Sequence, residues 1–503
     1  MVTANAAHFV YDVPSTGPVE RGSGGGQFSY DALEAKGRRK AAPNRIVRED
    51  VHVSAGKRTK LQASARDLAK NFSIAAWMIR RHLDYCASFT FQAKTSDRGL
   101  NKAIEQLMEI QSRPLACDRG GRFSREKMFR QVEASRVLDG DIGMLRLRSG
   151  HTQLIESDCV RDPDAGEKKR SDDRFEWVDG VQVDYAGLPR QYSVHGRKKG
   201  GRGYEFRRTV PAQNFLLYGF FDRPASDQVR GISPIVAALN NFRDVYDNID
   251  YAQVKMKITQ LFALALLRKS EAQGLNEALP TAGEQAVLDG EACEEDVSRP
   301  REFDLSGGPT VLDLDTDESV EVIESNTPAT EFQSFIEIVL AVGLKSLDIP
   351  YSFYNERFTN YSGSRTAWLH YERSCGDRRA DQIEARRRWT LWQLQRWIAD
   401  GIWTPPSGQS IADIKFEWIP RGMPWWKPSE EIVGDIKAIG AGFDNPDRVC
   451  RERDRGDPRD NIDATLEIIK YAMDQGKAVI GPDYEHKLNF SADFGVGAPE
   501  AAV

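Results

Sequence analysis

The feature that most constrains this chain is one long helical pattern. It opens at Ser233-Pro234, where a capping hydroxyl and a first-turn proline favour a helix start, and no further glycine or proline follows until Gly274. About 35 residues at a rise of 1.5 Å each give a rod of roughly 50 Å. One small domain cannot cover such a rod, so its apolar side needs a partner. Apolar residues recur along it with heptad-like spacing around polar Gln253: Leu239, Phe242, Tyr246, Ile249 and Met256.

The segment after this helix is strongly acidic. The whole chain carries a net charge of −6, yet residues 263–327 hold sixteen acidic and four basic side chains, a local charge of −12. The rest of the chain therefore totals +6. Turn residues at 307–309 and short β-like pieces at 310–314 and 319–323 indicate a small β-containing insert. A second helix is expected at about 330–345.

The first half of the chain predicts a loosely ordered arm and a mixed α/β region. Residues 1–60 contain the Gly-rich run 22–26 and the basic cluster 36–40, without the Gly-Lys-Ser/Thr of a phosphate-binding loop. The pattern is helical from Leu61 to about Ile110. Residues 144–148 alternate like a half-buried strand, and 175–183 read as strand, Asp-Gly turn and strand. A further turn is expected over 184–191.

The second half is expected to be mainly helical. Residues 349–363 have loop character, and a helix is expected over 364–400 with Ser364 as its N-cap. Further helices are expected at about 429–441 and 461–475, followed by a disordered tail at 491–503. The tryptophans near the end of the long helix lie at helical spacing with aliphatic residues and favour packed core over a ligand site: Trp389, Leu391, Trp392, Leu394, Trp397 and Ile398.

Four short elements, in this order, resemble the lambda-type portal protein family of tailed bacteriophages. They are Ala65–Asn71, the run from Pro211-Ala212 through Asp222-Arg223-Pro224 to Gln228–Gly231, Asn360–Arg365, and the Trp/Pro-rich element 418–430. The resemblance covers roughly residues 30–465. The chain departs from the family pattern at Lys70, at Gly363-Ser364 and at Lys427.

The resemblance implies an α+β portal fold in a cyclic homo-oligomer of twelve subunits. Its parts would be an N-terminal arm (1–60), an α/β wing (61–232), a stem helix (233–265), an acidic clip (266–327) and a second stem helix (328–348). After these would come a tunnel loop (349–363), a long wing helix (364–400), a C-terminal wing and crown (401–490), and a tail (491–503). The seam of the first stem helix is expected to pack against the same helix of a neighbouring subunit.

In this family the ring occupies one vertex of the capsid and passes double-stranded DNA during packaging and ejection. The implied partners are the terminase large subunit, the head–tail adaptor, the major capsid protein and the scaffold. The implied location is the virion, after assembly in the host cytoplasm. No cofactor, metal or catalytic residue is implied, and no apolar run approaches the ~20 residues that span a membrane.

Three groups of residues are candidates for the DNA path. Stem residues could form sparse basic rings: Lys255, Lys257, Arg268 and Lys269. Tunnel-loop residues could contact the DNA backbone or pack between subunits: Tyr354, Asn355, Arg357, Asn360 and Tyr361. Clip acids could repel phosphates and keep DNA sliding, or could form a solvated outer face: Glu291, Glu294, Glu295, Asp296, Asp313, Asp315, Asp317 and Glu318. The arginines at 378, 379 and 386–388 could face DNA, but pairing with nearby acids is favoured.

Two other classes of function stay open. An enzyme, for example a nuclease, could use the carboxylates of Asp139 and Asp141, although the glycine between them favours a turn. A monomeric nucleic-acid-binding module is the other alternative, but the acidic pI of 5.8 speaks against it. Six cysteines lack C-x-x-C spacing, which argues against a zinc site or a disulfide framework: Cys86, Cys117, Cys159, Cys293, Cys375 and Cys450.

Overall fold

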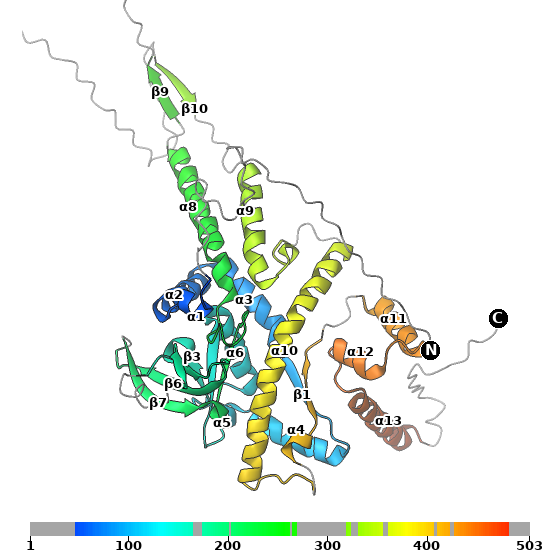
Figure 1. Ribbon diagram of the computed structural model, residues 1–503. Helices are drawn as coiled ribbons and strands as arrows, with labels where there is room; N and C mark the ends of the chain where they lie inside the picture. Colours follow the sequence, from blue (N-terminus) through cyan, green and yellow to red (C-terminus); the bar gives the residue numbers. More distant parts are fainter. Residues whose placement is uncertain are drawn as a thin grey trace, which may run out of the picture.

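The computed structural model describes nine stretches of the chain. They are residues 46–163, 174–200, 203–261, 264–268, 318–322, 330–355, 361–406, 410–422 and 427–481. Figure 1 shows a mixed helical and β body, with helices that project from it and further helices on the far side of a long crossing helix. No helix in these stretches is long and apolar enough to cross a membrane.

The body begins with a layer of helices. α1 (Glu49–His52) lies within the predicted arm 1–60 and α2 (Ala55–Asn71) begins in it, so the last part of this segment is helical instead of loosely ordered. α3 (Ser73–Cys86), α4 (Arg98–Gln111), α5 (Pro114–Cys117) and α6 (Arg125–Asp139) follow. The helical expectation for 61–110 is confirmed only in part, because the strand β1 (Phe89–Ala93) separates α3 from α4.

Two antiparallel sheets lie beside these helices. β2 (Asp141–Arg146) is the central strand between β3 (Thr152–Glu156) and β8 (Phe215–Gly219). The second sheet has the order β4-β5-β6-β7, with bounds Glu176–Val178, Val181–Val183, Pro189–Arg197 and Tyr204–Pro211. The strand expected at 144–148 is found only in part, because β2 ends at Arg146, and it is not half-buried, because residues 141–145 are all buried. Its two faces serve two separate cores: Met144 packs with α6 and α10, and Leu145 packs with the second sheet.

The expected Asp-Gly hairpin turn between β4 and β5 is confirmed. Asp179 and Gly180 both have positive φ values, 44° and 88°, as a two-residue hairpin of this type requires. A Cβ at Gly180 would lie 2.5 Å from the backbone nitrogen of Arg161, so only glycine fits there. In contrast, β6 begins at Pro189, inside the segment that the sequence predicts as a turn.

Two helices, α8 (Leu239–Leu261) and α9 (Thr330–Leu344), project from the body (Figure 1). The 3-10 turn η4 (Pro234–Ala238) leads into α8, and the Ser233 hydroxyl accepts from the backbone N–H of Ile235 as expected. The expectation of a 35-residue helix is wrong. α8 has 23 residues, about 35 Å, because 264–268 instead form the strand β9 (Leu264–Arg268) and pair with β10 (Glu318–Val322).

The inner half of the α8 seam is covered by the same chain. Leu239, Phe242 and Val245 are buried, and α8 contacts α9 and α2. A Cβ at Gly343 of α9 would lie only 3.1 Å from the Phe242 ring, so glycine permits this close contact. This part of the seam therefore does not wait for a neighbouring subunit, contrary to the expectation.

The long helix α10 (Tyr361–Ala399) crosses the body (Figure 1). Ser364 is not its N-cap, because the helix already begins at Tyr361, and the buried Ser364 hydroxyl has no hydrogen-bond partner. The packed-core interpretation of the tryptophans is confirmed. Trp389 is fully buried and donates its Nε1–H to the Thr152 hydroxyl at 2.9 Å, and Trp392 and Trp397 pack in the same core.

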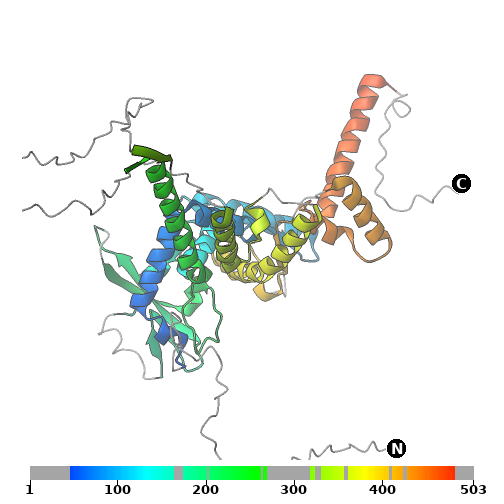
Figure 2. The same cartoon turned by 90° about the horizontal axis from the view of Figure 1, so that it is seen from above.

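The C-terminal part adds one strand and three helices. β11 (Phe416–Pro420) pairs with β1, and α11 (Pro428–Gly440), α12 (Pro446–Glu452) and α13 (Pro458–Ile480) follow. Two of these helices, α11 and α13, match the expected ranges, whereas α12 was not predicted. Short 3-10 turns, η5 (Lys345–Leu347), η6 (Tyr351–Phe353) and η8 (Ile411–Asp413), complete the connections. Seen from above, α8 and α13 stand on opposite sides of α10 (Figure 2).

Candidate functional site

The root of α8 is held by a buried arginine. Arg230 has no exposed surface and makes a two-pronged ion pair with Asp141, its Nε and Nη2 lying 2.8 and 2.9 Å from the carboxylate oxygens. It also donates to the carbonyls of Val160, Asp179 and Ser157 at 2.6 to 2.9 Å. Burial alone would raise the pKa of Asp141, but Arg230 outweighs it and holds that pKa below its ordinary value. The pair is therefore charged and locked.

Helix α2 reaches the same place with two arginine side chains. Arg58 donates to the Gly231 carbonyl at 2.6 Å and pairs with Asp179 at 2.7 Å. Arg66 pairs with both carboxylate oxygens of Asp139 at 2.6 and 2.7 Å. The structure thus joins two of the elements singled out in the sequence, 65–71 and 228–231, through Asp139 and Asp141. We call this set of residues the stem-root network.

Asp139 and Asp141 are therefore structural residues. Each carboxylate is taken by an arginine, and Gly140 between them has a φ of 93° and fits against the backbone of Gly231, where a Cβ would lie 2.5 Å from its carbonyl oxygen. The interpretation as a turn is confirmed. Within the described stretches, no three His, Cys, Asp or Glu side chains are grouped so that they could hold a metal ion.

The outer surfaces of α8 and α9 carry exposed apolar side chains. On α9, Phe335, Ile338 and Val342 are 49%, 64% and 54% exposed. Their spacing of three and four residues places them on one face of the helix. On α8, Tyr251 and Val254 are 71% and 50% exposed. We call these five residues the stem apolar faces. Exposed apolar groups gathered on projecting helices are typical of an assembly surface.

Of the predicted basic stem residues, two are fully described. Lys255 and Lys257 are exposed in the outer half of α8, one and three residues beyond Val254. Arg268 lies at the end of β9, opposite Glu318 of β10 in the strand register. Lys269 lies outside the described residues, as do seven of the eight predicted clip acids: Glu291, Glu294, Glu295, Asp296, Asp313, Asp315 and Asp317.

The described start of the predicted tunnel loop packs on its own chain. The Tyr354 ring meets Trp77 of α3 edge-on, with 6.0 Å between centroids, and remains 41% exposed. The backbone N–H of Asn355 donates to the Tyr351 carbonyl at 3.0 Å. Arg357 and Asn360 lie outside the described residues, and Tyr361 opens α10. The contact of these residues with DNA stays a prediction.

The arginines of α10 make contacts within the chain. Arg379 pairs with Glu372, and Arg387 lies 3.4 Å from Glu384, as expected. Arg378 pairs instead with Asp348 at 2.8 Å. Arg386 is fully buried and donates to the Ala87 carbonyl, and Arg388 donates to the carbonyls of Ala212 and Phe215. This arrangement favours a structural role for the run over contact with DNA.

The sequence motifs and this geometry can be compared with known proteins. The family described as phage portal protein, lambda family, matches residues 36–379, which is more than half of the chain. The chain belongs to that family. The match includes the stem-root network and both projecting helices. Among curated proteins, none matches the sequence.

Three solved structures of gene transfer agent particles are similar to this chain. The neck of an empty gene transfer agent particle is 13% identical, with a TM-score of 0.44, over 77% of this portal chain and 92% of that chain. The neck of a native gene transfer agent particle, computed with C12 symmetry, is 13% identical with a TM-score of 0.42, over 80% and 99%. The virion of a native gene transfer agent particle gives 13% and 0.41, over 79% and 98%.

Proposed function

We propose that twelve copies of this portal protein form a ring at one vertex of a capsid. The observation that carries the proposal, beside family membership, is the pair of stem apolar faces on α8 and α9. A single chain leaves these faces in water, although the inner part of each helix packs against its own body. A ring removes them from water, because the same two surfaces meet at every boundary between subunits.

The contact we propose is head to tail. Phe335, Ile338 and Val342 of one subunit pack against Tyr251 and Val254 of the next. The two sets lie on different helices, so the contact joins unlike surfaces and repeats around a closed ring. Burying the exposed halves of five side chains contributes several kcal/mol to each contact, since a full burial of one such side chain is worth about 1.5–3 kcal/mol.

The ring would serve as a conduit for double-stranded DNA during packaging and ejection. Lys255 and Lys257 would lie near the outer end of the stem and centre the duplex through its phosphates. The acid-rich stretch 271–324 would repel phosphates and let the duplex slide. The terminase large subunit and the head–tail adaptor would dock on the same end of the ring, and the capsid protein and scaffold would surround the body.

Particle imaging tests this function. Purified full-length chain, examined by negative-stain imaging and native mass spectrometry, is expected to give annular particles whose mass corresponds to twelve copies. A chain that stays monomeric at every concentration and salt condition would contradict the ring. A chain that binds duplex DNA tightly as a monomer would favour the nucleic-acid-binding alternative instead.

A further inference from the structure

The strand β11 has an edge that no described strand covers. β1 pairs with one edge only, in a two-stranded sheet. Arg421 donates to the Ser88 carbonyl and Lys94 donates to the Lys415 carbonyl, so the odd-numbered residues of β11 face β1. The N–H groups of Phe416 and Trp418 therefore point to the other edge. Such an edge can accept an additional strand.

This free edge borders a groove. A cavity of about 760 Å³ lies between α10, β11 and α12, and all residues from Phe416 to Gly422 line it. A second cavity of about 600 Å³ shares Arg387, Phe416 and Glu417 with the first and continues along α10 to Gln395. Together they follow α10 from Arg365 to Gln395, about 45 Å at 1.5 Å per residue. We call this combined cavity the edge groove.

The walls of the edge groove suit an extended apolar segment. The buried indole N–H of Trp368 has no hydrogen-bond partner and could donate to a backbone carbonyl. The apolar wall residues come from both α10 and β11: Trp368, Leu369, Ile383, Leu391, Phe416, Ile419 and Pro420.

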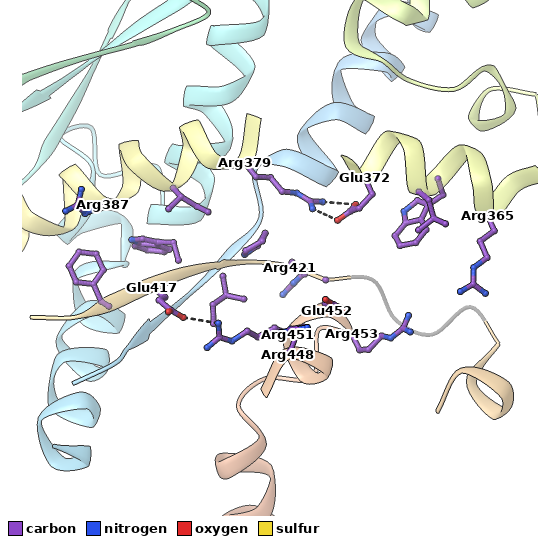
Figure 3. A pocket seen from close by; sticks show the side chains of 18 residues that line it. Arg365, Glu372, Arg379, Arg387, Glu417, Arg421, Arg448, Arg451, Glu452 and Arg453 are labelled. Carbon is purple, nitrogen blue, oxygen red and sulfur yellow. Dashed lines mark hydrogen bonds and ion pairs between the residues drawn. The ribbon is translucent and has the colours of Figure 1, made fainter. Parts of the chain in front are cut away.

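The arginines that line the larger cavity already have carboxylate partners. Figure 3 shows Arg379 of α10 paired with Glu372, and Arg451 of α12 paired with Glu417 of β11. Arg453 pairs with Glu431 at 3.0 Å. The groove is therefore not a free anion site. Its specificity would come from strand pairing and apolar contact.

We propose that residues 8–13 of a neighbouring subunit add a strand to the free edge of β11. This segment reads His-Phe-Val-Tyr-Asp-Val, rich in the aromatic and β-branched residues that favour strands. Phe9, Tyr11 and Val13 alternate along it, so they would share one face. The first twenty residues contain no lysine or arginine that would face the arginines of the walls.

We assign the added strand to a neighbouring subunit because of the place where the described chain begins. α1 lies on one side of α10 and α12 lies on the other, in both views (Figures 1 and 2), and α12 borders the edge groove. In a head-to-tail ring, opposite sides of adjacent subunits meet. The 32 residues between Val13 and Ile46 can span up to about 105 Å when extended, ample to reach the next subunit. This step depends on the ring proposed above.

A photo-cross-linking experiment tests the inference. Full-length chain with Tyr11→benzoylphenylalanine is assembled as a mixture of unlabelled and ¹⁵N-labelled subunits, irradiated, and mapped by mass spectrometry. Native mass spectrometry of the same sample measures the particle mass. We expect cross-links from position 11 to residues 379–391 or 416–420, half of them between labelled and unlabelled chains. The same cross-linker at Gly24 serves as a control and is expected to map elsewhere.

A second variant tests strand pairing itself. Val10→Pro removes one backbone N–H donor and is expected to lower the cross-link yield about fivefold, the effect of one lost hydrogen bond. Val10→Thr keeps this donor and is expected to keep the cross-link yield. Rings whose cross-links lie outside the edge groove, or only within one chain, would overturn this inference and leave the ring intact. Monomers with cross-links only within one chain would overturn both the added strand and the proposed ring. Equal cross-link yields for the two Val10 variants would exclude an added strand.

Discussion

Replacing Ile338 by aspartate is expected to prevent ring assembly without unfolding the chain. Ile338 is 64% exposed in the single chain, so a carboxylate there remains in water and costs the monomer little. In the proposed ring, the same position is buried against α8 of the next subunit. Fully burying an isoleucine side chain is worth about 1.5–3 kcal/mol, and about two thirds of that remains to be gained on assembly.

The charge adds a second cost to each contact. Burying an unpaired carboxylate costs at least about 2 kcal/mol more, so each contact weakens by about 4 kcal/mol, close to three powers of ten in affinity. Every subunit in a closed ring carries the change, so assembly should be lost at concentrations where the parent chain is fully annular.

Mass photometry across a concentration series measures this effect. Gln333→Asp is the matched control, because it places the same carboxylate on α9 five residues away, about 140° around the helix from Ile338. The control is expected to assemble normally, and both variants should melt within a few degrees of the parent. Rings of Ile338→Asp at the parent's concentration would refute the proposed contact.

Three further outcomes are expected. Arg230→Lys keeps the charge but loses the two-pronged contact with Asp141, so it should lower stability by about 3 kcal/mol in denaturant unfolding, while the exposed Arg207→Lys should change it little. Glu133 is fully buried; desolvation opposes its ionisation, but hydrogen bonding to His82 and the nearby Arg136 hold its pKa at about 2 instead of 4.5. The ionised carboxylate contributes on the order of 3 kcal/mol to the free energy of unfolding; this contribution is present above pH 4.5 and is lost as the pH falls toward 2. Glu133→Gln should therefore flatten the change in the free energy of unfolding between about pH 5.5 and pH 3. An unchanged slope in this variant would contradict the reasoning. Four clip acids can be changed to amides: Glu294, Glu295, Asp315 and Asp317. This change is expected to lower the amount of DNA packaged per procapsid, whereas unchanged packaging and unchanged motor binding would contradict repulsion of the DNA phosphates by the clip.

Local features of the fold could be predicted from the sequence. The Asp179-Gly180 turn and the capped start at Ser233 depend on a few neighbouring residues, and both are found as expected. The family motifs also identified the elements that meet at the stem root. The helix expected over 364–400 is found, but it begins earlier, at Tyr361, because the residues just before Ser364 are already helical.

Features that depend on distant partners could not be predicted. β1 pairs with β11, whose residues lie more than 300 positions later, so its five residues between two helices gave no signal. α8 ends early because β9 finds its partner in β10, some fifty residues further along. The partners of Arg230 were equally hidden, since Asp141 precedes it by 89 positions. The DNA-facing residues of the loop and clip remain predictions.

The stem-root network also determines how the portal would respond to mechanical load. A force along α8 reaches the body through the packing of its inner half and through Arg230 and Gly231, from which it divides among α2, the α6–β2 turn and the β4–β5 hairpin. Apolar surfaces slide past one another under shear, whereas a two-pronged ion pair resists in fixed directions and yields abruptly. α8 would thus tilt as a rigid lever together with the hairpin, and the compliance of the proposed ring would lie outside this joint.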